Sequence, residues 1–438
     1  MNKSILALLA AILLLTSCAP AQYHVEQAVK AFDDGSYGAV SNPELVTDRH
    51  EKIAVKPEME GLDKAYAGRS KRTGDMHLHS LYSDGKTSVE DLVSQMDGVG
   101  YDFLALSDHN NWYHQQNPAL TAQNSLPAME WTSKTGHINV FFPDKESLEK
   151  VGDFTYKGKK VSLGTGKPMQ DTSDFWGKEM QINLRKIERL QPENGTLHKE
   201  FMQYIESIGG VASINHPFSG INDSEPLDKL QLPWVFKREP AVVDGMPNLA
   251  VWEQLETKYV EIWNGTAKGL ASSGSCNNKY AKNLWYGLLQ RGHKVYALAG
   301  TDGHGDLTGT AAAHLFTTGN TAADTFAALK AGNLSVSAAK GPYIQLAYGE
   351  TPMGGTAQYA PEQNLKVRIG NAPDQLTVRI LTDQGTAYYN QVTTTKGIFE
   401  IDFPTEPRKY YLVELKDAQD QEFLAFSNPI FFEEATTK

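Results

Sequence analysis

The segment His77-Leu78-His79, followed by Asp84, is where the chain first offers side chains that could bind a metal ion. Residues two apart on a β-strand project from the same face, so both imidazoles can reach one ion. Asp84 lies in a Ser-Asp-Gly turn that can fold its carboxylate back toward them. Imidazole and carboxylate are common ligands of zinc, manganese and iron. A single His-x-His motif is weak evidence, so a metal site needs support from the rest of the chain.

Similar side chains follow other apolar segments. Apolar runs end at Ser107-Asp108-His109-Asn110, at Asn215-His216-Pro217 and at Gly300-Thr301-Asp302-Gly303-His304. Burying so many ionisable groups together would be costly, whereas metal coordination satisfies them jointly. The sequence therefore predicts a shared metal cluster, with the candidate ligands His77, His79, Asp84, His109, Glu130, His137, His216, Asp302 and His304.

The elements that must position these ligands alternate between strand and helix. Between the predicted strands Gly74–His79 and Phe103–Leu106, apolar residues at helical spacing predict a helix capped by Ser88. Further strands are predicted over 126–130, 137–142, 211–214, 259–263 and 295–299, and helices over 196–208, 278–291 and 321–330. Residues 143 to about 190 are expected to form an insertion looped over the mouth of the site. The alternation is typical of a parallel α/β barrel, whose site lies at the C-terminal ends of its strands.

The pattern changes after about Pro342. From Leu365 onward, apolar and polar residues alternate in short segments, separated by turns with Gly, Asn, Asp and Pro. A period of two with turns at short intervals predicts a small antiparallel β-sandwich. We expect this region to pack against the barrel and shape one wall of the site, to bind glycan, or to act as a spacer.

The N-terminus has the pattern of an export signal. Lys3 precedes an apolar run, Ile5–Leu15, that is too short for an ordinary transmembrane span. Leu15-Thr16-Ser17-Cys18 resembles a bacterial lipobox, in which Cys18 becomes the lipidated first residue. The alternative is ordinary signal cleavage beside an incidental cysteine. The expected organisation is a signal peptide over 1–18, a tether over 19–70, a metal-binding domain over 71–342 and a sandwich over 343–438.

Charge and composition exclude some classes of protein. Hydrophobic residues make up 40% of the chain, which is enough for a packed core. The net charge of -11 argues against nucleic-acid binding, which needs a basic face for phosphates. The negative net charge does not exclude a small anionic substrate, because bound divalent ions can make the electrostatic potential at a site positive. If Cys18 is lipidated, Cys276 is the only cysteine left and a disulfide framework is excluded.

Taken together, the motifs resemble the PHP (polymerase and histidinol phosphatase) superfamily over about residues 71–342. Within it, Glu261-Ile262-Trp263-Asn264-Gly265 and Gly341-Pro342 make the chain most similar to the carbaryl-hydrolase-like group. The resemblance implies a distorted seven-stranded (β/α) barrel, so that the whole chain would be an α/β protein with a C-terminal β-sandwich. The matching motifs are His77-Leu78-His79-Ser80, Ser107-Asp108-His109-Asn110, Glu130 with His137, Asn215-His216-Pro217 and Thr301-Asp302-Gly303-His304.

The resemblance also implies a site for two or three divalent ions of zinc, manganese or iron. In the family's pattern, one ion is held by His77, His79, Glu130 and Asp302, a second by His137, His216 and the bridging Glu130, and a third by Asp84, His109 and His304. A water bridging two such ions becomes a hydroxide nucleophile. No catalytic side chain is then needed beyond the metal-bound hydroxide, and the chain has no Gly-x-Ser-x-Gly elbow.

The leading functional prediction is a metal-dependent hydrolase of a phosphomonoester or phosphodiester, with a small phosphorylated molecule as substrate. The first alternative is hydrolysis of a carboxylic ester, carbamate or amide, because the same hydroxide can attack a carbonyl. The alternative from another class is a non-catalytic surface lipoprotein that binds metal. The protein is expected to be an exported bacterial lipoprotein, held by a lipid anchor at the outer membrane or facing the periplasm.

Other polar and aromatic residues near the strand ends could support or line the site. Asp75, Asp108 and Asn215 could orient the ligating imidazoles or serve as turn and cap residues. The candidates for the substrate pocket, each of which could instead have a plain packing or surface role, are Trp112, Tyr113, His114, Lys134 and Asn264.

Overall fold

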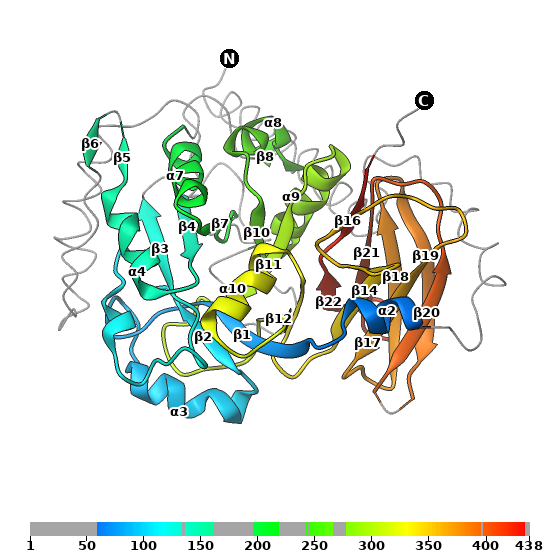
Figure 1. Ribbon diagram of the computed structural model, residues 1–438, viewed down its shortest axis with the longest axis horizontal. Helices are drawn as coiled ribbons and strands as arrows, with labels where there is room; N and C mark the ends of the chain where they lie inside the picture. The colour runs from blue at the N-terminus through cyan, green and yellow to red at the C-terminus, as the bar shows by residue number, and fades with distance from the viewer. Residues whose placement is uncertain are drawn as a thin grey trace, which may run out of the picture.

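The computed structural model shows a mixed α/β protein with two lobes (Figure 1). It describes residues 59–133, 136–156, 158–160, 196–218, 242–243, 246–265, 277–395 and 397–433. The predicted signal peptide with Cys18, the pocket candidate Lys134 and the lone Cys276 lie outside the described residues. Within them, no helix is long and apolar enough to cross a membrane.

The first lobe is built on two groups of strands. One sheet has the order β11-β10-β7-β4-β3, and the other group has the order β13-β12-β1-β2. Isolated bridges join Leu78 to Gly303 and His109 to Glu130, so the strands of the two groups approach each other at the ligand-bearing segments. Their bounds are β1 Ser70–Leu78, β2 Phe103–Leu106, β3 Ala128–Ser133, β4 Gly136–Phe141, β7 Val211–Ile214, β10 Tyr259–Asn264, β11 Tyr296–Gly300, β12 Ala312–Thr317 and β13 Leu334–Ser337.

Strand direction departs from the parallel arrangement that the sequence predicts. The pairs β1–β2, β7–β10 and β10–β11 are parallel, but β4 is antiparallel to both β3 and β7, and β1 is antiparallel to β12. Only two residues separate Ser133 from Gly136, with which it pairs. A connection of that length can join antiparallel strands only, since parallel neighbours need a long crossover.

Helices of the first lobe carry clear end signals. Ser88 is the N-cap of α3, and its side chain accepts a hydrogen bond from the backbone N–H of Asp91. Gly100 caps the other end of the helix in the left-handed conformation, with φ 91°. Thr321 and Asp324 form a capping box at α10. The helices are α3 Val89–Val99, η2 Tyr113–Gln116, α4 Lys145–Glu149, η3 Lys150–Asp153, α7 Thr196–Ser207, α8 Leu249–Trp252, η6 Glu253–Leu255, α9 Asn278–Gln290 and α10 Ala322–Lys330. Two short hairpins complete the lobe, β5 Thr155–Tyr156 with β6 Lys159–Lys160 and β8 Val242–Val243 with β9 Met246–Pro247.

The second lobe is formed by strands from two sheets. A described four-stranded sheet has the order β15-β14-β17-β20, and the remaining strands belong to the ten-stranded sheet that also contains β1 and β2. Ile344 and Val367 of the first sheet share one apolar core with Val378 and Val413 of the second. The strands are β14 Tyr343–Tyr348, β15 Thr351–Pro352, β16 Thr356–Ala357, β17 Asn364–Gly370, β18 Gln375–Thr382, β19 Gly385–Thr393, β20 Phe399–Pro404, β21 Tyr410–Lys416, β22 Phe423–Ser427 and β23 Ile430–Phe432.

The two lobes are joined by backbone pairing and by a shared core. Strand β13 pairs antiparallel with β22, so the ten-stranded sheet continues across the predicted boundary at residue 342. The helix α2, Glu60–Ala65, precedes β1 in sequence but packs in the second lobe (Figure 1), where the Tyr66 hydroxyl donates to the carbonyl of Leu346 over 3.0 Å. The last residues of the predicted tether are therefore an ordered part of the fold.

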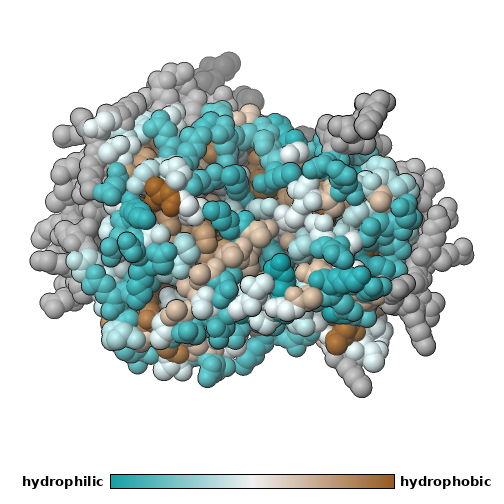
Figure 2. Space-filling view, in the orientation of Figure 1, coloured by the Kyte–Doolittle hydropathy of each residue, from teal (hydrophilic) through white to brown (hydrophobic). Residues whose placement is uncertain are grey.

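The surface seen in Figure 2 is mainly hydrophilic, with hydrophobic residues in small separate patches. Among the described residues, the exposed large hydrophobic side chains are Leu81 and Ile398. Leu81 lies directly after the first predicted ligand motif, so this exposed apolar side chain is close in sequence to the site.

Candidate metal centre

The end of β1 carries the first two predicted ligands. His77 and His79 are both fully buried, and their rings pack edge to face with centroids 5.2 Å apart. Both Nε2 atoms face the carboxylate of Glu130, at 3.4 Å for His77 and 3.6 Å for His79. The period-two spacing therefore brings these imidazoles to one point, as the sequence predicts.

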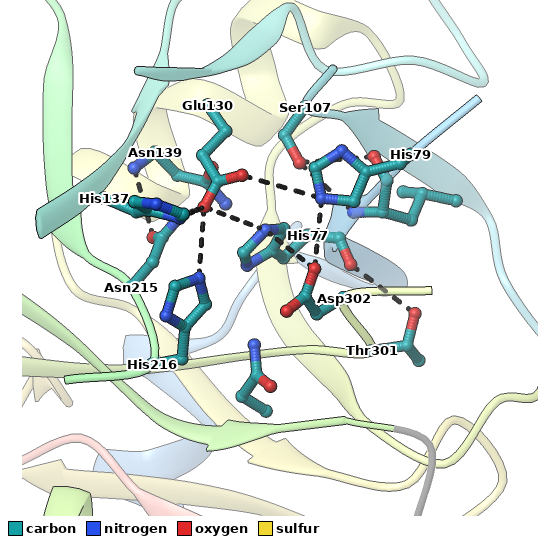
Figure 3. A network of polar contacts seen from close by, with 12 residues as sticks. His77, His79, Ser107, Glu130, His137, Asn139, Asn215, His216, Thr301 and Asp302 are labelled. Carbon is teal, nitrogen blue, oxygen red and sulfur yellow. Dashed lines mark hydrogen bonds and ion pairs between the residues drawn. The ribbon is translucent and has the colours of Figure 1, made fainter. Parts of the chain in front are cut away.

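Glu130 lies at the centre of the imidazoles (Figure 3). It is fully buried in β3, and the amide of Asn215 donates to its Oε1 over 2.9 Å. The remaining contacts of its carboxylate are to His109 Nδ1 at 2.7 Å, His137 Nδ1 at 3.2 Å and His216 Nε2 at 3.2 Å. A carboxylate with several imidazoles on both of its oxygens has the arrangement expected of a bridging ligand.

Asp302 closes the cluster from the segment after β11. Its Oδ1 lies 3.0 Å from His79 Nε2 and 3.4 Å from His77 Nε2. Both Asp302, with φ 49°, and His216, with φ 25°, have left-handed backbones although neither is glycine. Such conformations are strained and persist where the surrounding structure holds them, often at functional sites.

Asp84 belongs to a second group on the other side of His79. Its carboxylate lies 3.2 Å from His304 Nε2, 3.6 Å from His109 Nε2 and 3.9 Å from His79 Nδ1. The ring of His79 stacks against those of both His109 and His304, at centroid distances of 4.3 and 4.4 Å. The turn after β1 thus folds back as expected, and its carboxylate reaches three imidazoles.

The electrostatics of the cluster are strongly coupled. Burial acts to raise the pKa of Glu130, but His109 and His77 hold it well below its ordinary value. Burial acts to lower the pKa of His109, yet Glu130 and Asp84 raise it to about 10. Burial lowers the pKa of His137 to about 4. Among the described residues, these carboxylates pair with imidazoles, so protonated imidazoles or a bound cation would balance their charge.

All nine predicted ligands fall into four groups whose donor atoms lie within 4.8 Å of one another. The groups differ from the family's pattern: His216 lies with His77 and Asp302, His137 lies with His109 and Glu130, and His79 also lies with the group of Asp84. The buried Nε2 of His77 has no hydrogen-bond partner among the described residues, whereas Glu130 Oε2 lies 2.7 Å from His109 Nδ1. Imidazole nitrogens and carboxylate oxygens that converge in this way suit a divalent cation, so this donor set fits the metal ions that the resemblance implies. The groups are His79-Asp84-His109-His304, His77-His79-Glu130, His77-His216-Asp302 and His109-Glu130-His137.

Asp75 and Asn215, which were predicted to support the ligands, form hydrogen bonds with the segments that carry them. Asp75 accepts hydrogen bonds from the backbone N–H groups of His77 and Thr301, at 3.1 and 2.9 Å, and from the Thr301 hydroxyl at 2.6 Å. Asn215 accepts from the backbone N–H of Asn139 while it donates to Glu130. These contacts tie β1, β4 and the end of β11 together directly beneath the ligands.

Asp108 supports the turn that carries Asp84. It accepts hydrogen bonds from the backbone N–H and the hydroxyl of Ser80, at 2.8 and 2.7 Å, and from the Ser83 hydroxyl at 2.6 Å. The ring of His114 lies beside it, with Nδ1 2.9 Å from its Oδ2. His114 is fully buried there, so its position favours support of this turn over the predicted place in a substrate pocket.

The other described pocket candidates are also engaged elsewhere. Trp112 and Tyr113 are half-buried, and the Trp112 ring packs over Gly152, where an added Cβ would lie 3.0 Å away. Asn264 is 1% exposed and donates to Glu261. Trp112 and Asn264 thus have packing or hydrogen-bond roles, and a place of these residues or of Tyr113 in a substrate pocket stays a prediction.

Sequence reasoning assigned no role to Glu261. This residue of β10 is 3% exposed, and its Oε1 lies 2.9 Å from His77 Nδ1. Its Oε2 accepts from the backbone N–H of His216 over 2.8 Å. The sequence did contain a signal for this role, since Glu261 is the lone carboxylate of the otherwise apolar strand Tyr259–Trp263. Such a charge is rarely buried without partners.

Comparison with known proteins gave similarities to solved structures only. No family model and no curated protein matches the chain. A two-domain protein from Bacteroides vulgatus, containing a predicted PHP-like metal-dependent phosphoesterase, is 13% identical, with a TM-score of 0.39 over 83% of this chain and 96% of that chain. A candidate metal-dependent phosphoesterase from Bifidobacterium adolescentis is 15% identical, with a TM-score of 0.30 over 53% of this chain and 88% of that chain. An amidohydrolase from Chromobacterium violaceum, with bound sulfate and no metal, is 16% identical, with a TM-score of 0.31 over 53% of this chain and 87% of that chain. At these values, the function has to be argued from the site itself.

Proposed function

We propose that the protein is a metal-dependent hydrolase of the PHP type and that it acts on phosphoesters. In this proposal the strands of the first lobe correspond to a distorted PHP barrel and the second lobe to an appended sandwich. The nine predicted residues would hold two or three divalent ions. Zinc, manganese and iron all suit a donor set of imidazoles and carboxylates.

The charge balance of the cluster carries the proposal. Asp84, Glu130 and Asp302 lie close together, and their ion pairs among the described residues are with histidines, not with Lys or Arg. Carboxylates removed from water need a nearby positive charge. Divalent cations supply it and leave the imidazoles neutral, as ligating histidines must be.

The ligand geometry also favours a substrate with spread negative charge. Divalent ions held there would lower the pKa of water toward neutrality and neutralise charge on an ester's oxygens. Glu130 and His79 each belong to two or more of the ligand groups, so these groups surround a common centre. A phosphoryl group spreads its charge over several oxygens, which suits ligand groups on more than one side. The side chain of His304 is 37% exposed and that of His137 is 15% exposed, so substrate would enter on their side.

A substrate panel on the full chain tests the proposal. Metal-stripped protein would be reloaded with Zn²⁺ or Mn²⁺ and assayed with p-nitrophenyl phosphate, bis(p-nitrophenyl) phosphate, naphthyl esters and naphthyl carbamates. We expect turnover of a phosphate ester, and a loss of at least about 100-fold in His77→Ala and Asp302→Ala, since each removes a predicted ligand. The exposed Asp97 is the matched control, and Asp97→Asn should keep full activity.

The outcomes separate the alternatives. Turnover confined to the carbonyl substrates would make the phosphoesterase assignment wrong and favour the ester or carbamate hydrolase. Metal binding without turnover of any substrate would favour a non-catalytic metal-binding protein. Activity that survives both ligand substitutions would rule out the metal-dependent mechanism.

We also propose that the protein is exported and lipidated at Cys18. The support is the short apolar run Ile5–Leu15 followed by Leu15-Thr16-Ser17-Cys18. Bacteria that express the full chain should incorporate labelled palmitate into it, and Cys18→Ala should remove the label. Equal labelling of both proteins would contradict lipidation at this residue.

A further inference from the structure

We propose that Glu261 is a positioning residue that sets the tautomer of His77 and holds the backbone at His216, so that both imidazoles face the same metal cluster. This inference rests on the proposed metal-dependent function. Glu261 does not itself face the cluster, because both of its oxygens are occupied by groups behind the two histidines.

Three polar groups contact the carboxylate of Glu261. The backbone N–H of His216 and the side-chain amide of Asn264 reach Oε2 over 2.8 and 3.0 Å, and the ring nitrogen Nδ1 of His77 reaches Oε1 over 2.9 Å. A backbone N–H and the NH₂ group of an amide can only donate. An ionised carboxylate can only accept, so the third contact is a hydrogen bond only if His77 carries a proton on Nδ1.

The tautomer of His77 determines whether its Nε2 atom carries a proton or a free lone pair. With the proton on Nδ1, the neutral ring presents the lone pair of Nε2 on its far side. That atom is buried and lies 3.4 Å from Glu130 Oε1 and 3.4 Å from Asp302 Oδ1. A lone pair that faces two carboxylate oxygens is unfavourable unless a cation lies among them. Glu261 therefore prepares His77 as a metal ligand through Nε2.

The same carboxylate acts on His216 through the backbone. His216 has φ 25°, a strained value for a non-glycine residue. Its N–H donates to Glu261, and its Nε2 lies 3.2 Å from Glu130 Oε1. Glu261 thus links the end of β1 to the segment after β7, and the two rings stack with centroids 5.6 Å apart.

Replacing Glu261 by glutamine tests the acceptor role at nearly constant shape. An amide has one oxygen that accepts and one NH₂ that donates. The NH₂ group of Glu261→Gln must face either His77 Nδ1, which then keeps a hydrogen bond only as the other tautomer, or the N–H groups of His216 and Asn264. Supporting partners of ligating histidines are typically worth 10–100-fold in metal affinity. We therefore expect calorimetry of the metal-stripped full chain to show a loss of about 10–100-fold in Zn²⁺ and Mn²⁺ affinity.

A matched control separates positioning from a general effect of losing a buried carboxylate. Glu414 is 2% exposed and accepts from the Tyr286 hydroxyl over 2.6 Å at the interface between α9 and β21. Glu414→Gln makes the same chemical change away from the cluster and should keep wild-type metal affinity. With Co²⁺ as the probe, Glu261→Gln should change the visible d–d absorption bands, whereas Glu414→Gln should leave them unchanged.

A second variant decides the matter if Glu261→Gln does not fold. Asn264→Asp replaces the donor 3.0 Å from Glu261 Oε2 with a carboxylate and should lower metal affinity in the same direction. Wild-type affinity, within about twofold, in a folded Glu261→Gln or Asn264→Asp protein would overturn the positioning role. That result would leave the proposed function intact, whereas a wild-type chain that binds neither Zn²⁺ nor Mn²⁺ would refute the metal-dependent function itself.

Discussion

The side-chain amide of Asn428 pairs with both backbone polar groups of Ala297, accepting from the N–H over 2.7 Å and donating to the carbonyl over 3.5 Å. Asn428 comes from the second lobe, between β22 and β23, whereas Ala297 lies in β11, the strand that leads to Asp302. The amide therefore completes the edge of a strand that positions a predicted ligand. The second lobe is in this way a structural part of the site's scaffold.

The first prediction follows from this contact. Asn428→Ala should lower the free energy of unfolding by about 1–3 kcal/mol, because it leaves the buried N–H of Ala297 without a partner. Urea denaturation measures the change. The exposed Gln358, also in the second lobe, provides the control, and Gln358→Ala should stay within about 0.5 kcal/mol of wild type. Equal stability of both variants would mean that the amide contact does not support β11.

Close packing of β11 on β1 gives a second prediction. A Cβ at Gly300 would lie 2.4 Å from Cβ of His77 and 2.6 Å from its backbone nitrogen, so a strand must shift. Gly300→Ala should destabilise the protein by about 1–3 kcal/mol and weaken metal binding, since the shift displaces a predicted ligand. Thermal unfolding and calorimetry with Mn²⁺ measure the two effects.

The control for this substitution has the opposite expected sign. Gly98 lies inside α3, and an added Cβ there would meet nothing within 4 Å. Gly98→Ala should therefore raise stability by about 0.5–1 kcal/mol, because alanine loses less backbone freedom in a helix. A Gly300→Ala protein with wild-type stability and metal affinity would show that the two strands do not approach as closely as described.

A third prediction concerns the support of the turn that carries Asp84. Asp108→Asn replaces one accepting oxygen by a donating NH₂, so at least one of the hydrogen bonds from Ser80 and Ser83 is lost. Hydrogen bonds to a charged group are worth about 1.5–3 kcal/mol, and we expect a loss of that size in urea denaturation. Asp97→Asn makes the same change at an exposed position of α3 and should have no measurable effect. An Asp108→Asn protein as stable as that control would contradict the supporting role.

The fourth prediction is a pH dependence that arises from a histidine outside the ligand groups. His314 is fully buried in β12, between the hydroxyls of Thr73 at 3.0 Å and Ser337 at 2.7 Å. Burial and the nearby Lys71 lower its pKa from 6.5 to about 3. Between these two pH values the unfolded chain binds a proton that the folded protein does not, so stability falls as the pH falls.

The contribution of His314 should amount to about 2 kcal/mol between pH 6.5 and pH 5, since one pKa unit corresponds to about 1.4 kcal/mol. Above pH 6.5 this contribution fades, because the unfolded chain also loses the proton. His314→Gln, compared with wild type by chemical denaturation from pH 7.5 to pH 4.5, should show a shallower slope. Parallel curves for wild type and His314→Gln would exclude this residue as a source of the acid sensitivity.

Local patterns in the sequence predicted individual elements well. Ser88 begins α3, and His77 and His79 project to one face, because capping and strand periodicity depend on neighbouring residues only. The direction of β4 was missed, and so were the strands β12, β13, β14 and β19. A short connection overrides the parallel pattern at β4, and Gly385–Thr393 carries little apolar alternation. Contacts between distant segments, such as β13 with β22, leave no local signal at all.

By itself the sequence determined which residue types can bind metal, and where apolar strands and helices would place them, because spacing and periodicity are local properties. Only the tertiary structure decided that Glu130 lies among the imidazoles, that Glu261 holds His77 and His216, and that Asn428 completes β11. These relationships depend on which strands become neighbours. That choice is made by burial of the whole core rather than by any one segment.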